Sequence, residues 1–181
     1  MKQSRKQFIK TASLGFTGFF FPADFLLSSD EAEPVIVHEG EGEKYWIGPR
    51  NSPLTIKISD SQNGKRSLSF CTEEIAPGEG IPLHKHLNED ELIFVHTGEG
   101  ILTVGDKEIG VKKGSVALIP KHCWHGVKNT GSEIFIMVFA YTPAGFEGYF
   151  REFGSPVGKP WQPKSQAEYE KLNKKWGIVY K

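Results

Sequence analysis

Two histidines two positions apart lie near the middle of the sequence. His84 and His86 occupy an apolar segment bounded by turn residues, and Glu91 follows at the start of an apolar run at 92–95. Side chains alternate between the faces of a strand, so residues at i and i+2 point the same way. With His125 further along the chain, three imidazoles and one carboxylate predict a site for one divalent transition metal ion: Fe, Mn, Ni, Cu or Zn.

The spacing of these residues resembles the two motifs of the cupin family, G(X)5HXH(X)3-4E(X)6G and G(X)5PXG(X)2H(X)3N. The first motif is matched by Gly78, His84, His86, Glu91 and Gly98. The second is matched by Gly114, Pro120, His125 and Asn129, with His122 at the position where the family usually has glycine. The surrounding strands extend the resemblance to roughly residues 35–155.

The resemblance implies a single jelly-roll β-barrel whose metal ligands are His84, His86, Glu91 and His125. The short spacing between the motifs resembles that of small microbial cupins of the cupin_2 type, and residues 142–154 resemble the stretch that follows the barrel in quercetin-dioxygenase-like cupins. In that class an enol or phenol substrate binds the metal, and the glutamate takes the substrate proton. The resemblance therefore implies a dioxygenase-type oxidoreductase with Glu91 as its catalytic residue. A cupin isomerase or lyase and a non-catalytic periplasmic small-ligand-binding module remain alternatives, because fold and site do not fix the reaction.

Other polar residues near the motifs are alternative candidates for metal ligands. Glu91 fits both spacings of the first motif, so Glu89 and Asp90 are expected to be solvated loop charges. If Glu91 faces the barrel interior, alternation places His96 on the outside. For His122, a role beside the metal and a plain surface position both stay open.

The elements that must position these residues are short strands. Apolar and polar residues alternate at 54–59, and the chain from 91 to 141 reads as a meander with glycine turns. Asn63-Gly64 predicts a hairpin, and a short strand is expected at 35–37. Many short strands between glycine turns favour an all-β barrel or sandwich, with an apolar inner face that includes Ile93 and Val95.

The C-terminal part of the sequence predicts helices. Aromatic residues recur at helical spacing in 145–153 and should pack on the barrel as one face. Ser165 and Glu168 form a capping-box pattern that predicts a helix ending near Trp176. The expected organisation is a signal segment at 1–33, a cupin barrel at 34–158 and a helical tail at 159–181.

The first 33 residues have the composition of a transport signal. Basic residues precede an apolar, glycine-containing run, and the segment from Ser4 to Lys10 resembles a twin-arginine signal with Lys6 in place of the second arginine. Export to the periplasm is therefore expected, by the twin-arginine or the Sec route. Glycine, proline and aspartate interrupt the apolar run, so no stable membrane span is expected.

The composition and the net charge limit the classes of binding partner that the sequence predicts. The formal net charge is zero, so nothing in the bulk charge predicts nucleic-acid binding. The two cysteines, Cys71 and Cys123, do not make a disulfide framework, and whether they pair stays open. A small-molecule substrate is expected, and a homodimer is compatible with the sequence.

Overall fold

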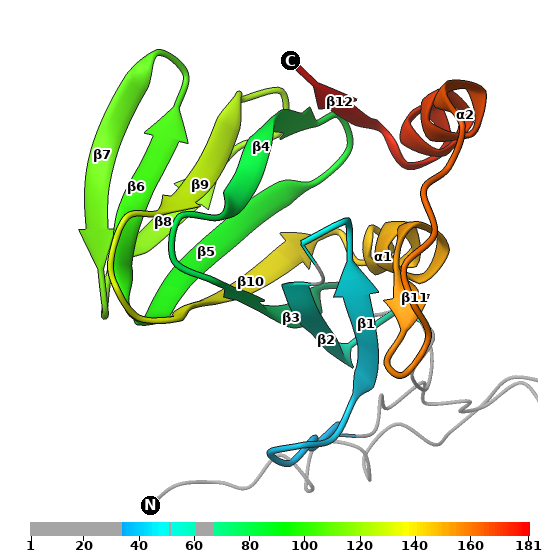
Figure 1. Cartoon of the computed structure of the whole chain (residues 1–181), viewed down its shortest axis with the longest axis horizontal. Coiled ribbons are helices and arrows are strands. Elements are labelled where there is room, and N and C mark those ends of the chain that lie inside the picture. The colour runs from blue at the N-terminus through cyan, green and yellow to red at the C-terminus, as the bar shows by residue number, and fades with distance from the viewer. Residues whose placement is uncertain (1–33, 51, 61–66) are drawn as a thin grey trace, which may run out of the picture. The chain divides into compact units, whose positions relative to one another are not determined.

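The computed structural model describes residues 34–50, 52–60 and 67–181, and these residues form two facing antiparallel sheets (Figure 1). The larger sheet has the strand order β11-β1-β2-β3-β10-β5-β8. Its strands are β1 (Glu43–Ile47), β2 (Ser52–Ile58), β3 (Ser69–Ile75), β5 (Asp90–Thr97), β8 (Val116–Ile119), β10 (Phe135–Thr142) and β11 (Ser155–Pro156).

The smaller sheet has the order β12-β4-β9-β6-β7. Its strands are β4 (Gly80–His86), β6 (Glu99–Val104), β7 (Lys107–Lys112), β9 (His125–Asn129) and β12 (Ile178–Tyr180). Buried apolar side chains from both sheets fill the space between them, with Leu54, Ile75, Phe135 and Phe139 among the most deeply buried. The predicted all-β jelly roll is confirmed.

Strand β5 shows how the alternation predicted from the sequence is realised. Glu91, Ile93 and Val95 are buried, whereas Leu92, Phe94 and His96 are exposed. The strand pairs with β10 on one side and with β8 on the other. Because the buried face of β5 looks toward the smaller sheet, Glu91 is carried to the interior, where the histidines lie.

Two short helices follow the barrel strands, as the sequence predicts. Helix α1 (Glu147–Phe153) buries Tyr149 and Phe150, and Phe146 at its N-cap is 1% exposed, so the expected aromatic face packs against the barrel. Helix α2 (Gln166–Trp176) begins at the predicted capping box of Ser165 and Glu168. It ends at Gly177, whose φ of 63° is the left-handed conformation that glycine adopts without strain.

The end of the chain differs from the sequence-based expectation of a helical tail. After α2, strand β12 pairs with β4, with Ile178 opposite His86 and Tyr180 opposite His84. Three residues are too few for a periodic pattern, so this strand could not be predicted from the sequence. The pairing makes the tail part of the smaller sheet, next to the two histidines.

The remaining expectations have mixed outcomes. Residues 35–37 form no strand, and Cys71 and Cys123 are both free thiols. The predicted Asn63-Gly64 turn and the signal segment at 1–33 lie outside the described residues. Within the described part of the chain, no helix is long and apolar enough to cross a membrane.

Candidate metal centre

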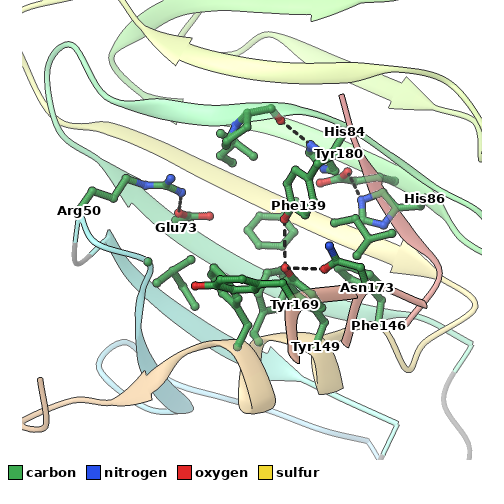
Figure 2. A pocket seen from close by; sticks show the side chains of 18 of the residues that line it. Arg50, Glu73, His84, His86, Phe139, Phe146, Tyr149, Tyr169, Asn173 and Tyr180 are labelled. Atoms are coloured by element: carbon green, nitrogen blue, oxygen red, sulfur yellow. Dashed lines mark hydrogen bonds and ion pairs between the residues drawn. The ribbon is translucent and has the colours of Figure 1, made fainter. Parts of the chain in front are cut away.

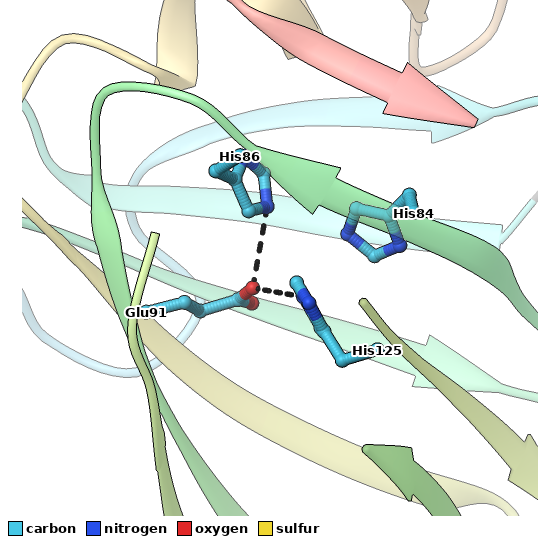
Figure 3. A group of neighbouring side chains, drawn as sticks. All are labelled: His84, His86, Glu91 and His125. Atoms are coloured by element: carbon cyan, nitrogen blue, oxygen red, sulfur yellow. Dashed lines mark hydrogen bonds and ion pairs between the residues drawn. The ribbon is translucent and has the colours of Figure 1, made fainter. Parts of the chain in front are cut away.

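The four residues predicted as metal ligands meet in the interior, between the two sheets (Figure 3). His84 and His86 come from alternate positions of β4, and His125 lies opposite His84 on β9. Glu91 reaches them from β5 in the other sheet. All four side chains are buried, and one potential ligand atom from each lies within 4.8 Å of the others.

Backbone carbonyls orient two of the imidazoles. The Nδ1 atom of His84 lies 2.8 Å from the carbonyl oxygen of Pro82, and Nδ1 of His125 lies 3.0 Å from that of Cys123. In the neutral ring each Nδ1–H donates to its carbonyl, which leaves the lone pair on Nε2. This is the arrangement in which metal-bound histidines are commonly held by their surroundings.

The imidazole of His86 lacks hydrogen-bond partners. Both of its ring nitrogens are buried, and neither has a hydrogen-bond partner among the described residues. Its Nε2 lies 3.3 Å from Oε2 of Glu91, which is within ion-pair range but without hydrogen-bond geometry. Buried polar groups in proteins are nearly always satisfied, so an unpaired imidazole pointing into a cluster of ligand atoms fits a metal ligand.

Glu91 forms the closest contact in the cluster. Its Oε2 atom lies 2.8 Å from Nε2 of His125. If Nδ1 of His125 carries the ring proton, the Nε2 lone pair faces an anionic oxygen, and this contact needs a cation or a second ring proton between the atoms. In the metal-free protein a second proton on His125 satisfies this contact. Burial disfavours the charged form of His125, but the effect of the Glu91 carboxylate is larger and raises the pKa of the imidazole.

The electrostatics of the other two groups favour the forms that bind metal. Burial opposes ionisation of Glu91, but the imidazoles of His125 and His86 outweigh it and hold the pKa of the carboxyl below its usual range. Burial, followed by the neighbouring His125, lowers the pKa of His84 to about 3. An ionised carboxylate and a neutral imidazole are both ready to donate lone pairs, so the residues present fit a divalent transition ion.

Asn129, the last residue of the second motif, has a structural role. Its side-chain amide donates to the carbonyl oxygens of Ile75 (2.9 Å) and Glu133 (2.8 Å), and its Oδ1 accepts from the backbone N–H of Gly131 (3.0 Å). The side chain is 0% exposed. Asn129 therefore ties β9 to the ends of β3 and β10, far from the ligand atoms.

His122 is an exposed residue of the turn before β9, so the surface interpretation is the one that holds. Its φ of 68° is left-handed, which explains why glycine suits this position. Histidine is among the non-glycine residues that tolerate this conformation. Its backbone N–H donates to the carbonyl oxygen of His86 at 2.7 Å, so the turn contributes to the site through its backbone.

Of the other residues weighed from the sequence, His96 is exposed as predicted and contacts Thr97 through Nδ1. The prediction of solvated charges was wrong for Glu89, which is 9% exposed, and burial raises its pKa to about 7. Asp90 is half-buried and accepts a hydrogen bond from the backbone N–H of Lys121 at 2.9 Å. That bond joins the segments of the two motifs.

A cavity of about 460 Å³ opens beside the cluster, and His84, His86 and Glu91 form part of its wall (Figure 2). Nine of the lining residues are Phe, Tyr or Trp: Phe139, Tyr141, Phe146, Tyr149, Phe150, Phe153, Trp161, Tyr169 and Tyr180. Ile93 and Val95 belong to the apolar inner face, as expected, but not to the lining of this cavity. Both are buried, but they line a separate small cavity.

Two polar groups in this cavity were not found from the sequence. Nη2 of Arg50 lies 2.9 Å from Oε1 of Glu73. The hydroxyl groups of Tyr149 and Tyr180 lie 3.2 Å apart. A signal for Glu73 existed, because it occupies an inward position of the alternating strand β3, between two buried residues.

Comparison with known proteins agrees with the geometry. Residues 71–141 match the family model described as "Cupin domain". The chain carries a cupin domain. The matched stretch contains all four clustered residues, so the cupin motifs and the buried cluster coincide.

Two curated relatives share part of this cupin. An oxalate-binding protein of Thermotoga maritima is 32% identical over 75 residues, which is 41% of this chain and 62% of the relative. An uncharacterized protein of Methanocaldococcus jannaschii is 33% identical over 85 residues, 46% of this chain and 66% of that protein. The matches thus span just under two thirds of each relative.

Among solved structures, an RmlC-like cupin from Shewanella frigidimarina resembles the chain with a TM-score of 0.52. The sequence identity is 17%, and the match covers 62% of this chain and 93% of the other. This likeness supports the shared fold, and the chemistry has to be argued from the site.

Proposed function

We propose that this cupin is a mononuclear metal-dependent oxidoreductase of the dioxygenase type that acts on a small phenol or enol. The observation that carries the proposal is the position of the His84, His86, Glu91 and His125 cluster on the wall of an aromatic-lined cavity. A volume of about 460 Å³ lies within the range of small-molecule sites. An octahedral ion held by these four residues would have two further coordination positions, which a substrate oxygen could occupy.

A divalent ion held by these residues would supply Lewis-acid polarisation of a substrate hydroxyl and, for a redox-active metal, a route for dioxygen chemistry. The base is Glu91. Its Oε2 faces the imidazoles, whereas Oε1 has no hydrogen bond to any described residue. Because Glu91 also lines the cavity, Oε1 is the atom that accepts the proton of a bound phenol or enol.

The cavity walls bind and orient the rest of the substrate. Phe146 lies edge-on to His86 with ring centroids 4.3 Å apart, and Tyr180 lies 5.7 Å from His84. These rings cover the histidines on the cavity side with apolar surface, which favours a flat ring and excludes water. Dry surroundings strengthen the electrostatic interaction between Glu91 and the substrate proton.

Oxygen uptake tests the proposal. Protein resupplied in turn with Fe, Mn, Ni, Cu or Zn would be mixed with a panel of phenols and 1,3-dicarbonyl compounds in an oxygen-electrode cell. We expect oxygen consumption with at least one redox-active metal and none with Zn²⁺. Absence of oxygen consumption with every metal, in preparations holding one ion per chain, would contradict the oxygenase assignment.

A second candidate is binding of a small dicarboxylate without oxidation. One observation favours it, the 32% identity to a relative named as an oxalate-binding protein. The size of the cavity and its aromatic walls speak for a larger and less polar ligand. Calorimetric titration of the metal-loaded protein with oxalate separates the two, since tight oxalate binding without oxygen uptake supports the second candidate.

We also propose that residues 1–33 direct export to the periplasm. The support is the order of basic and apolar residues in this segment, which lies outside the described part of the chain. The twin-arginine route transports folded proteins, which would suit a metal-loaded barrel.

A further inference from the structure

The ion pair of Arg50 and Glu73 lies in the wall of the same cavity, away from the four clustered residues (Figure 2). Glu73 belongs to β3, and Arg50 follows β1. The side chain of Glu73 is 4% exposed and that of Arg50 is 16% exposed. A buried carboxylate and a largely buried guanidinium are costly to desolvate, so their presence in the wall of a largely apolar cavity calls for an explanation.

The guanidinium of Arg50 has donors to spare. It offers five N–H donors, and the described residues accept from only one nitrogen, Nη2, through the bond to Glu73. Its Nε is buried and has no acceptor among the described residues. Because Arg50 lines the cavity, the N–H groups of its two Nη atoms that Glu73 does not use are the donors available to a ligand.

The strand register gives the separation between this pair and the candidate metal centre. Glu73 lies opposite Met137 of β10, and Glu91 lies opposite Tyr141 of the same strand. Four residues correspond to about 13 Å along β10, and because β3 and β5 lie on opposite sides of β10, the backbone positions of Glu73 and Glu91 are also two strand spacings apart across the sheet. Figure 2 agrees, with Arg50 and Glu73 at one side of the cavity and His84 and His86 at the other. A two-carbon acid such as oxalate is too short to contact both.

One wall between the two ends is largely apolar, although the side chains of Tyr149, Asn173 and Tyr180 also bring polar atoms to the cavity. The inward residues of β10 are Met137, Phe139 and Tyr141, each at most 3% exposed. Rings from α1 form the facing wall, where Tyr149 stacks on Phe153 with centroids 5.2 Å apart. A flat, elongated ligand fits between them, and hydrogen bonds are then available chiefly at its two ends.

The charges of Arg50 and Glu73 determine which chemical group of a ligand can bind beside Arg50. Arg50 and Glu73 together carry no net charge, so a carboxylate placed against Arg50 would also approach the Glu73 anion. A neutral acceptor, such as a ketone or ester carbonyl, accepts from the guanidinium without that repulsion. The other end differs, because a divalent ion with Glu91 and neutral imidazoles retains one net positive charge and suits a single anionic oxygen.

We propose that Arg50, held by Glu73, is a specificity-determining residue that binds a neutral carbonyl group at the far end of a flat aromatic substrate. The inference rests on the proposed function for the end of the substrate at the metal. It adds a second contact between protein and substrate, at Arg50, and this contact defines the length and the polarity of the ligand.

Three matched ligands test this inference on full-length protein loaded with Zn²⁺, which allows binding without oxidation. Each is a biphenyl with a phenol on one ring and a para substituent on the other: acetyl, ethyl or carboxylate. By titration calorimetry we expect the acetyl compound to bind about 10-fold more tightly than the ethyl compound, the usual weight of a hydrogen bond to a charged group. The carboxylate should bind more weakly than the acetyl compound.

Two variants complete the test. Arg50→Met keeps the aliphatic stem, and it should remove the preference for acetyl over ethyl. Arg151→Met is the matched control, because Arg151 also pairs with a glutamate, Glu43, but does not line the cavity. It should bind all three ligands as the unmodified protein does. Metal content and thermal unfolding of both variants show whether the fold is retained.

Three results would overturn the inference: a preference for acetyl that survives Arg50→Met, tightest binding of the carboxylate, or no binding of any probe by protein that retains its zinc. These results are separate from those of the oxygen-uptake experiment. A preference for acetyl that depends on Arg50, in a protein that consumes no oxygen with any metal, would leave the recognition site standing and remove the oxygenase reaction.

Discussion

His125 and Glu91 belong to different sheets, yet Nε2 of the first lies 2.8 Å from Oε2 of the second. The three imidazoles all come from the smaller sheet, and the carboxylate alone comes from the larger one. A cation bound by all four therefore joins the two layers of the barrel. The histidines and Glu91 can also be separated experimentally, because removing the carboxylate leaves the imidazole set on one sheet intact.

The first prediction concerns the metal. Purified protein should hold close to one divalent ion per chain, and His84→Ala combined with His86→Ala should reduce this to near zero, because both side chains of β4 that face the cluster are lost. Elemental analysis measures it. His96→Ala is the control, since His96 is exposed on β5 and should leave metal content unchanged. A double variant that kept its full metal content would exclude this site.

The second prediction distinguishes the role of Glu91 as a metal ligand from its role as a general base. Glu91→Gln keeps the shape and one oxygen donor but removes the charge and the basicity, so metal content should fall only partly while turnover falls by ~10²–10⁴-fold. Metal per chain and rate have to be measured on the same preparations, with metal resupplied. A metal-replete Glu91→Gln protein that ran at the unmodified rate would show that another group accepts the proton.

The third prediction concerns pH and the metal-free protein. Burial lowers the pKa of His84 to about 3, whereas the unfolded chain binds that proton near pH 6.5. Between these values the unfolded state holds one proton more, so this histidine makes stability fall as pH falls. Chelator-treated protein should therefore lose stability more steeply than His84→Gln below pH 6.5, by up to about 1.4 kcal/mol per pH unit. Urea unfolding at several pH values measures the difference, and parallel curves would contradict it.

The fourth prediction concerns the packing of the two helices. A Cβ added at Gly148 of α1 would lie 2.0 Å from Cη2 of Trp176 on α2, well inside contact distance. Gly148→Ala should cost roughly 1–3 kcal/mol of stability, as overpacked substitutions do. Gly110→Ala is the matched control, because nothing lies within 4 Å of its added Cβ and its φ is ordinary. Equal melting temperatures for the two variants would mean that the helices adjust freely.

The fifth prediction concerns export. A reporter fused after residue 33 should leave the cytoplasm, and Arg5→Lys with Lys6→Gln should block the twin-arginine route by removing the paired basic pattern. Fractionation of the native host measures where the reporter is. A reporter that stayed in the cytoplasm would refute the signal, and one still exported after both substitutions would point to Sec.

The strands could be predicted because they depend on local patterns, and the four clustered residues because their spacing resembles the two cupin motifs. Alternation along β5 places Glu91 inside and His96 outside whatever the remaining fold, and the spacing of His84 and His86 needs only one strand. The left-handed turn at His122 was also visible, as a departure from glycine in the motif. Each of these patterns spans only a few consecutive residues of the sequence.

What could not be predicted depends on contacts between distant segments. Arg50 reaches Glu73 only because β1, β2 and β3 are neighbours in the sheet, and the burial of Glu89 depends on how its turn packs. The cavity is lined by residues of α1, α2 and β12 as well as by the barrel strands. Strand β12 itself is too short for any periodic signal.

The pairing of β12 with β4 sets an order of events in biosynthesis. The strand that carries His84 and His86 receives its neighbour only when residues 178–180 have left the ribosome, long after all four clustered residues have been made. Until then Tyr180 does not lie against His84, and one edge of the histidine strand has an unpaired backbone. A metal ion that reached the histidines before β12 had paired with β4 would therefore meet an open, wetter and less selective site.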